Sequence, residues 1–156
     1  MRVIVPTTDE QWRAYLECRY RNLYAPFELP ESCTTSELDV PRNRPGVLHR
    51  MVMVADAGGV ESTAAVGRLD LQPEHSAGPS AQLRYFAVDG PHRGTGAGQM
   101  LMRHMEEQAR SAGCVRLWME ARTVAANFYA RLGYADIGEG PTKWGVIPHR
   151  LMAKAL

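Results

Sequence analysis

The chain has 156 residues, of which 45% are hydrophobic and 22% charged, with a formal net charge of +1. This length suffices for one domain with its own core, and the near-neutral charge argues against general binding to nucleic acid or to an anionic membrane. The three cysteines, Cys18, Cys33 and Cys114, form no close pair, which argues against a disulfide framework or a CxxC metal site. We therefore predict a single domain over residues 1–156 in the cytoplasm, without a membrane segment, because no apolar run approaches the roughly 20 residues that a span requires.

The N-terminal half predicts a strand, a helix and a hairpin. Residues 2–5 are β-branched, and Thr8 and Gln11 have capping-box spacing before a helical stripe. The weak pattern from residue 26 to 45 predicts a mobile surface segment with a short helix near residues 36–40. Residues 47–55 and 62–71 flank an Asp-Ala-Gly-Gly turn, which predicts an antiparallel hairpin. A polar loop over residues 72–81 leads into the next strand.

A strand at residues 83–88, a glycine-rich loop and a helix at 99–112 form the central pattern. Gly94, Gly96 and Gly98 allow backbone N–H groups to approach a ligand, and the helix start adds its own N–H groups and positive dipole end. Arg93 adds a charged donor. This pattern favours a pyrophosphate site, although a sharp strand-to-helix turn needs the same glycines. The loop is neither a P-loop nor a dinucleotide fingerprint, because Gln99 and Leu101 stand where those motifs need other residues.

The last third predicts a second strand, a helix and two more strands. Residues 115–121 alternate like a strand and follow a helix that Gly113 ends, so a right-handed crossover would make them parallel to residues 83–88. Thr123 is the expected N-cap of a helix with Val124, Phe128 and Leu132 on its core stripe. Residues 134–137 begin a strand, 138–145 form a loop, and 146–156 return antiparallel.

The sequence resembles those of the GNAT N-acetyltransferase superfamily over nearly the whole chain. The strand-loop-helix motif is matched by Val88-x-x-Pro91-x-Arg93-Gly94-x-Gly96-x-Gly98, and the second motif by Ala125-x-x-Phe128-Tyr129-x-x-x-Gly133-Tyr134. The ending Ile147-Pro148-His149-x-x-Met152-x-Lys154 resembles that of a bacterial subgroup. The resemblance implies an α/β fold, α+β in layer terms: a mixed, mostly antiparallel sheet of about six or seven strands with a central splayed parallel pair and about four helices.

The same resemblance implies acetyl-CoA as co-substrate, bound where the parallel strands splay apart. Its pyrophosphate would lie on the amides of residues 93–98, that is Arg93, Gly94, Thr95, Gly96, Ala97 and Gly98. Its pantetheine would pair with the backbone of Phe86, Ala87 and Val88. A β-bulge in that strand would direct an amide, expected to be that of Val88, at the thioester oxygen, where it stabilises the developing oxyanion.

Tyr129 matches the tyrosine that protonates the leaving thiolate as general acid in this family. A packed tyrosine bonded elsewhere is the alternative. Seven residues earlier many members carry an asparagine, and this chain has Arg122, which either contacts a CoA phosphate or is simply solvated. The general base is the least determined residue. Glu120, near the end of the second parallel strand, and His149 are the candidates, each with a structural alternative.

The expected function is acetyl transfer from acetyl-CoA to a primary amine of a small molecule, peptide or protein, by direct attack in a ternary complex. The alternatives are a non-catalytic acyl-CoA-binding sensor or adaptor, and a transferase for a larger acyl group. No metal is expected, since no ligand spacing is present. The acceptor is unknown, and a homodimer is an open alternative, because dimers are frequent among the proteins that this chain resembles.

Overall fold

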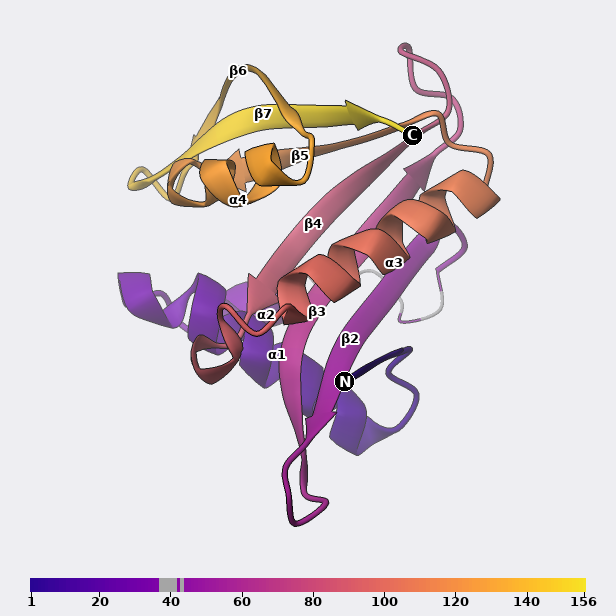
Figure 1. Cartoon of the computed structure of the whole chain (residues 1–156). Helices are drawn as coiled ribbons and strands as arrows, with labels where there is room; N and C mark the ends of the chain where they lie inside the picture. Colours follow the sequence, from indigo (N-terminus) through magenta and orange to yellow (C-terminus); the bar gives the residue numbers. More distant parts are fainter. Residues whose placement is uncertain (37–41, 43) are drawn as a thin grey trace. The chain divides into compact units, whose positions relative to one another are not determined.

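The computed structural model describes residues 1–36, 42 and 44–156. Over these residues the chain forms seven strands and four α-helices (Figure 1). In chain order they are β1 (Arg2–Ile4), α1 (Asp9–Leu23), α2 (Ser32–Ser36), β2 (Val47–Ala55), β3 (Glu61–Gln72), β4 (Ser80–Val88), α3 (Ala97–Ser111), β5 (Arg116–Arg122), α4 (Ala126–Arg131), β6 (Ala135–Lys143) and β7 (Ile147–Ala155). Most of the short helix expected at residues 36–40 lies outside the described residues.

The strands form one sheet in the order β1-β2-β3-β4-β5-β7-β6. β4 and β5 are parallel, with Ser80 opposite Arg116, whereas β7 is antiparallel to both β5 and β6. The predicted mixed, mostly antiparallel sheet with one parallel pair is therefore confirmed. The chain divides into two compact units, residues 1–68 with 85–105 and residues 69–84 with 106–156, and each is described by itself below. One domain over residues 1–156 stays a prediction.

In the first unit, α1 and α3 cover opposite faces of the strands (Figure 1). α1 begins with the predicted capping box, in which the Thr8 hydroxyl accepts from the Gln11 amide and the Gln11 side chain accepts from the Thr8 amide. Its buried face packs with strand residues in one core of Trp12, Tyr15, Cys18, Met51, Val66 and Ala87. On the α3 face, a Cβ at Gly67 would come within 3.2 Å of Met105 and 3.3 Å of Phe86. Glycine therefore permits the close packing there.

The second unit is built on β5, whose Leu117, Met119 and Ala121 are buried in alternation. Its polar core is Glu106, which accepts hydrogen bonds from Tyr134 Oη at 3.0 Å and Lys154 Nζ at 2.9 Å. The same Nζ donates to the Leu132 carbonyl at the end of α4. Lys154 in the last strand therefore satisfies a buried carboxylate and a helix end together.

Both predicted helix-ending glycines are confirmed. Gly113 and Gly133 have φ of +81° and +88°. The Cys114 amide bonds to the Ala109 carbonyl, and the Tyr134 amide bonds to the Tyr129 carbonyl. These bonds define Schellman motifs, which need a left-handed residue that glycine supplies at little cost.

Two expectations about the second unit are wrong. Thr123 does not cap a helix, because residues 123–125 form a 3-10 turn and α4 starts only at Ala126. Val124 is consequently 93% exposed, whereas Tyr129 belongs to the buried face at 6%. The predicted loop at residues 138–145 is largely strand, since β6 continues to Lys143. Register shifts around Gly138 and Thr142 break its two-residue period, which hides the strand in the sequence.

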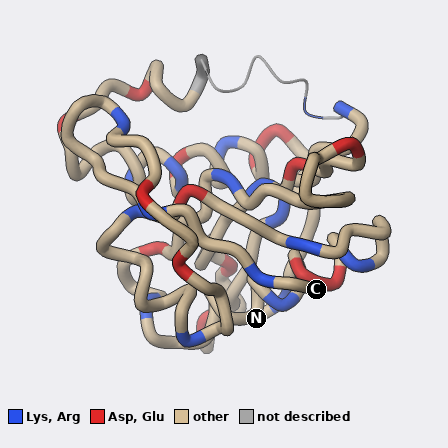
Figure 2. The backbone as a smooth tube through the Cα atoms, turned by 90° about the horizontal axis from the view of Figure 1, so that it is seen from above, with Lys and Arg blue, Asp and Glu red and all other residues tan. Residues whose placement is uncertain are grey.

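Charges of both signs are interspersed along the chain (Figure 2). Among the described residues, none of the helices combines the length and the apolar character that crossing a bilayer requires.

The lowered pKa of His49 should make the free energy of unfolding decrease in mild acid. Its ring is 4% exposed beside Trp12 and Tyr15, and burial, followed by the charges of Arg19 and Arg68, lowers its pKa to about 4. Because the unfolded chain takes up this proton first, the free energy of unfolding should drop by about 2 kcal/mol between about pH 7.5 and pH 5. Urea denaturation at both pH values should show that His49→Phe loses this part of the pH dependence. His75→Gln, at a partly exposed histidine, should keep it, and equal pH slopes for His49→Phe and the wild type would contradict the assignment.

Candidate functional site

The glycine-rich loop joins β4 to α3 in the first unit. Gly94 and Gly96 have φ of +79° and +92°, and a Cβ on either would meet no atom within 4 Å. The left-handed backbone, and not crowding within the protein, therefore favours glycine there. The Met100 amide bonds to the Gly96 carbonyl at 2.9 Å, so the amides just before it are those that a helix start leaves without an intrahelical partner. Open space beside the glycines and unpaired helix-start amides fit a pyrophosphate.

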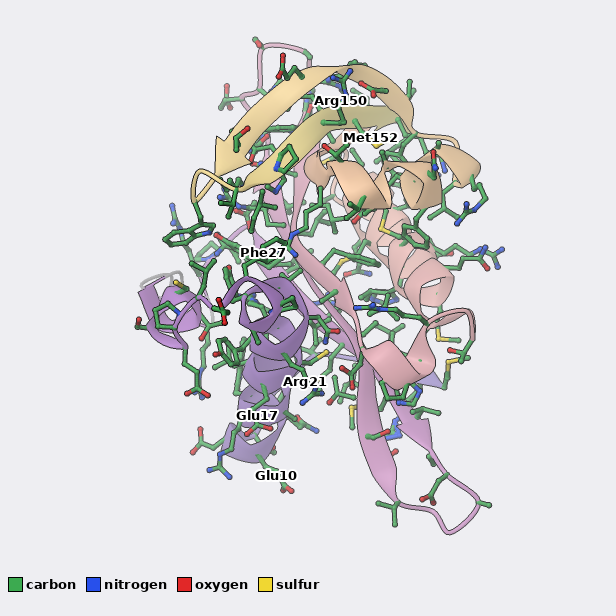
Figure 3. The ribbon with its side chains drawn as sticks, turned by 90° about the vertical axis from the view of Figure 1, so that its left-hand side faces the viewer. Glu10, Glu17, Arg21, Phe27, Arg150 and Met152 are labelled. Atoms are coloured by element: carbon green, nitrogen blue, oxygen red, sulfur yellow. The ribbon has the colours of Figure 1, made fainter. Side chains whose placement is uncertain are left out.

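Asp89 connects the start of this loop to the end of α1 through hydrogen bonds. Its carboxylate accepts from Arg21 Nε at 3.0 Å, from Arg21 Nη2 at 2.9 Å and from Asn22 Nδ2 at 2.9 Å. Hydrogen bonding to Arg21, labelled on α1 in Figure 3, is the main cause that holds the pKa of Asp89 below its usual range. The Asp89 amide donates to the Ala64 carbonyl at 2.9 Å. Sequence reasoning missed these anchors, because 67 and 68 residues separate Asp89 from its two side-chain partners.

Arg93, the charged residue expected at the pyrophosphate, is exposed and belongs to the same network. Its Nη2 donates to Asn22 Oδ1 at 3.1 Å, and its Nε lies 3.3 Å from the Val88 carbonyl. Within the loop, Thr95 Oγ1 donates to the His92 carbonyl at 2.7 Å. The loop is therefore held by α1 and β4 through side chains. A phosphate contact of Arg93 stays a prediction.

The strand before the loop, β4, runs continuously from Ser80 to Val88 but has an irregular backbone at Tyr85. Tyr85 has φ of +51°, one of three non-glycine residues with positive φ in the described part of the chain. A left-handed residue inside a strand is the mark of a β-bulge. Beyond it, Phe86 and Val88 are half-buried and Ala87 is buried. The irregularity lies three residues before Val88, and Val88 as amide donor stays a prediction. Tyrosine rarely adopts this conformation, so the sequence carried no signal for it.

Tyr129, the candidate general acid, lies in α4 of the second unit. Its ring packs edge-on against Phe128 and Tyr134, with centroid distances of 5.1 and 6.1 Å. Burial raises the pKa of its hydroxyl well above the ordinary value, and the positive charge of Arg122 offsets part of that rise. A phenol in this environment keeps its proton at neutral pH. It can therefore donate a proton but cannot serve as a resting base.

Glu120 forms an ion pair that the sequence did not predict. Lys143 Nζ lies 2.6 Å from Glu120 Oε2, and both side chains are partly exposed. Lys143 is in the stretch expected to be a loop, so its ion pair with Glu120 on β5 could not be predicted. Nearby on β5, Trp118 Nε1 donates to Gln72 Oε1 at 2.9 Å. The carboxylate of Glu120, the candidate base, is therefore paired with the primary ammonium group of Lys143.

Arg122 and His149 are brought together, because they are directly paired between β5 and β7. His149 is 5% exposed, and its Nδ1 lies 2.8 Å from the Ile147 carbonyl and 3.1 Å from the Pro141 carbonyl. Both partners accept only, so Nδ1 carries the proton and Nε2 is the nitrogen that can receive one. Burial lowers the pKa of His149, which favours the neutral ring. His149 thus has a clear structural role in holding β6 and β7 together.

A left-handed glycine loop between the end of a strand and the start of a helix is suited to binding phosphate groups through backbone amides. The sequence profile described as the acetyltransferase (GNAT) family matches residues 9–134. The chain belongs to this family.

Known relatives are similar over part of their length. An uncharacterised N-acetyltransferase of Bacillus subtilis is 31% identical over 85 residues, which is 54% of this chain and 57% of that protein. Streptothricin acetyltransferase of Streptomyces lavendulae is 44% identical over 50 residues, covering 30% of this chain and 26% of that enzyme. The chain thus spans less than two thirds of the curated relatives it matches.

Solved structures match over nearly the full fold. A putative N-acetyltransferase from Lactobacillus plantarum has a TM-score of 0.78 at 17% identity, with 99% of this chain and 97% of that chain covered. An aminoglycoside 6′-N-acetyltransferase complexed with coenzyme A has a TM-score of 0.73 at 17% identity, with the same coverage. These likenesses establish the fold.

Replacing Gly96 by alanine should weaken coenzyme A binding. Its φ of +92° is unfavourable for any residue with a Cβ, and the strain of about 1 to 3 kcal/mol predicts a rise in Kd of about 5- to 150-fold. Isothermal titration with CoA measures it. Gly90→Ala is the matched control, because Gly90 has open space and no positive φ. Equal Kd values for the two variants would contradict a backbone-based site.

Proposed function

We propose that this protein transfers the acetyl group of acetyl-CoA to a primary amine of a small molecule, peptide or protein. The observation that carries the proposal is the loop with left-handed Gly94 and Gly96 at the start of α3, in a chain of the acetyltransferase (GNAT) family. Relatives named for amine substrates, such as the streptothricin and glucosamine 6-phosphate acetyltransferases, support an amine acceptor.

The proposed reaction is a direct transfer in a ternary complex. The amine nitrogen attacks the thioester carbonyl carbon, an N–C bond forms, and the C–S bond breaks. Tyr129 gives its proton to the departing CoA thiolate, for which its buried, protonated hydroxyl is suited. The proton from the amine goes to Glu120, or to His149 Nε2, directly or through water. The backbone amides of residues 86–88 stabilise the developing oxyanion, which is usually the largest protein contribution to acyl transfer.

Three further assignments rest on sequence. The ending Ile147-Pro148-His149-x-x-Met152-x-Lys154 supports membership of a bacterial subgroup. Three cysteines, an odd number with no close pair in the sequence, support a cytoplasmic location. A homodimer is proposed from the frequency of dimers in the family.

Release of free thiol from acetyl-CoA tests the activity against a panel of amino acids, polyamines, aminoglycosides and N-terminal peptides. The proposal expects at least one amine to accelerate release above the rate without amine. A rise in melting temperature with acetyl-CoA but no release for any amine would support a sensor instead. Faster release from longer acyl-CoAs would support the larger-acyl alternative.

Tyr129→Phe should lower kcat about 100-fold while the Kd of CoA stays within about twofold, because only proton donation to the thiolate is lost. Single-turnover kinetics isolates the chemical step. Tyr134→Phe is the matched control: it removes a buried hydrogen bond to Glu106 and should lower stability without changing the chemical step. An unchanged chemical step in Tyr129→Phe removes this residue as the acid.

Glu120→Gln should lower kcat/KM about tenfold or more at neutral pH, because the amide cannot accept the amine proton. Lys143→Met, which removes the ion-pair partner and keeps the carboxylate, should not lower it. If both substitutions leave the pH–rate profile unchanged, Glu120 is not the base, and His149→Gln becomes the next variant to measure.

A further inference from the structure

A buried polar cluster lies beneath α1 in the first unit, and the reaction proposed above does not use it. We call it the Tyr85 cluster, and it consists of Tyr15, Arg19, His49, Arg68 and Tyr85. Arg19 is fully buried, and the Arg68 and His49 side chains are 6% and 4% exposed. Two guanidinium groups in a core are costly to desolvate, so a specific arrangement must compensate them.

The ring of Tyr85 is the point where both arginines meet. Arg19 Cζ lies 4.4 Å from the ring centroid, and Arg68 Cζ lies 5.6 Å from it. Both distances are within the range of attractive cation–π interactions, which strengthen when the groups are removed from water. The arginines come from α1 and β3, so they fix Tyr85 to two other elements of its unit.

Hydrogen bonds continue this arrangement to the β3 backbone. Arg19 Nη2 donates to Tyr15 Oη at 3.0 Å, and Tyr15 Oη donates to the Gly67 carbonyl at 3.1 Å. His49 Nδ1 lies 3.2 Å from the same hydroxyl. Because that hydroxyl has already given its proton to Gly67, His49 Nδ1 must be the donor. The Tyr15 oxygen is thereby saturated, and Arg19 is held in one place.

Tyr85 needs such support because its backbone is left-handed. A non-glycine residue at φ of +51° is strained and persists only where its surroundings impose it. The next residue, Phe86, lies on the other side of the strand, where a Cβ at Gly67 would be 3.3 Å from its ring. Consecutive aromatic residues thus hold this part of β4 from both faces.

We propose that Arg19 and Arg68 are positioning residues for acetyl transfer: through the Tyr85 ring they hold the left-handed turn that aims the backbone of residues 86–88 at the thioester. This inference rests on the proposed function. The arginines do not touch the reacting atoms. They determine the direction of the amide that polarises the carbonyl, and their loss should affect that polarisation more than cofactor affinity, since the loop at residues 93–98 holds the pyrophosphate.

The test measures the carbonyl itself, so it needs no known amine. Infrared difference spectra of acetyl-CoA labelled with carbon-13 at the thioester carbonyl, bound to the full chain, report the hydrogen bond to that oxygen. The rate of thioester hydrolysis by water reports its activation. Arg19→Met and Arg68→Met are compared with Arg13→Met, an exposed arginine on α1. Tyr85→Phe keeps the ring, whereas Tyr85→Ala removes the ring and keeps a Cβ, which makes the left-handed backbone unfavourable.

The wild type and Arg13→Met should show the carbonyl band displaced to lower wavenumber relative to free acetyl-CoA. In Arg19→Met and Arg68→Met, at least half of this displacement should be lost and hydrolysis should slow about tenfold, with Kd changed less than about twofold. Tyr85→Phe should retain the displacement and Tyr85→Ala should lose it, because alanine has a Cβ that disfavours the left-handed backbone and has no ring to hold it. Because an apolar residue in place of a buried charge can preserve stability, these losses should occur in folded protein.

Full displacement and an unchanged hydrolysis rate in Arg19→Met and Arg68→Met would overturn the inference, as would a Tyr85→Ala spectrum identical to the wild type. If either arginine variant does not fold, the Tyr85→Phe and Tyr85→Ala pair decides alone. Failure of the wild type to bind acetyl-CoA at all is a separate result, which overturns the proposed function.

Discussion

The contact between Asp89 and the end of α1 is the constraint on which the first unit depends. Asp89 stands where β4 gives way to the glycine loop, and it meets Arg21 through two charge-assisted hydrogen bonds. The carboxylate is only 12% exposed, so the pair is less screened by solvent than a surface ion pair. Asn22 extends the contact to Arg93. The loop therefore has its shape before a ligand arrives, and less ordering is needed on binding.

Local signals in the sequence predicted much of the fold. The capping box at Thr8 and the C-terminal glycines Gly113 and Gly133 follow from interactions within a few residues, and all three were found. The irregular part of β6 and the exposed Val124 were missed, because the first is held by pairing with β7 and the second depends on where a short helix starts. Periodicity describes only regular elements, and both segments are irregular.

The sequence indicated residues of the candidate site, but it did not indicate the residues that hold them in place. The loop glycines were found from their residue type and spacing, Glu120 from its place at a strand end and Tyr129 from the resemblance. The structure adds Lys143 at the carboxylate of Glu120 and the left-handed Tyr85 in β4. These are long-range or strained features, and neither has a signature in neighbouring residues. The positions that hold and orient a site are thus harder to find from sequence than the positions that carry its chemistry.

Lys154 connects three elements of the second unit through one ammonium group. From β7 it donates to the Glu106 carboxylate on α3, where Arg110 is a second cation, and to the Leu132 carbonyl at the end of α4. A substitution that removes the Lys154 ammonium would therefore take a donor from the end of α4 and one of the two cations from the Glu106 carboxylate, so α4 and β7 would lose a shared contact in a single step.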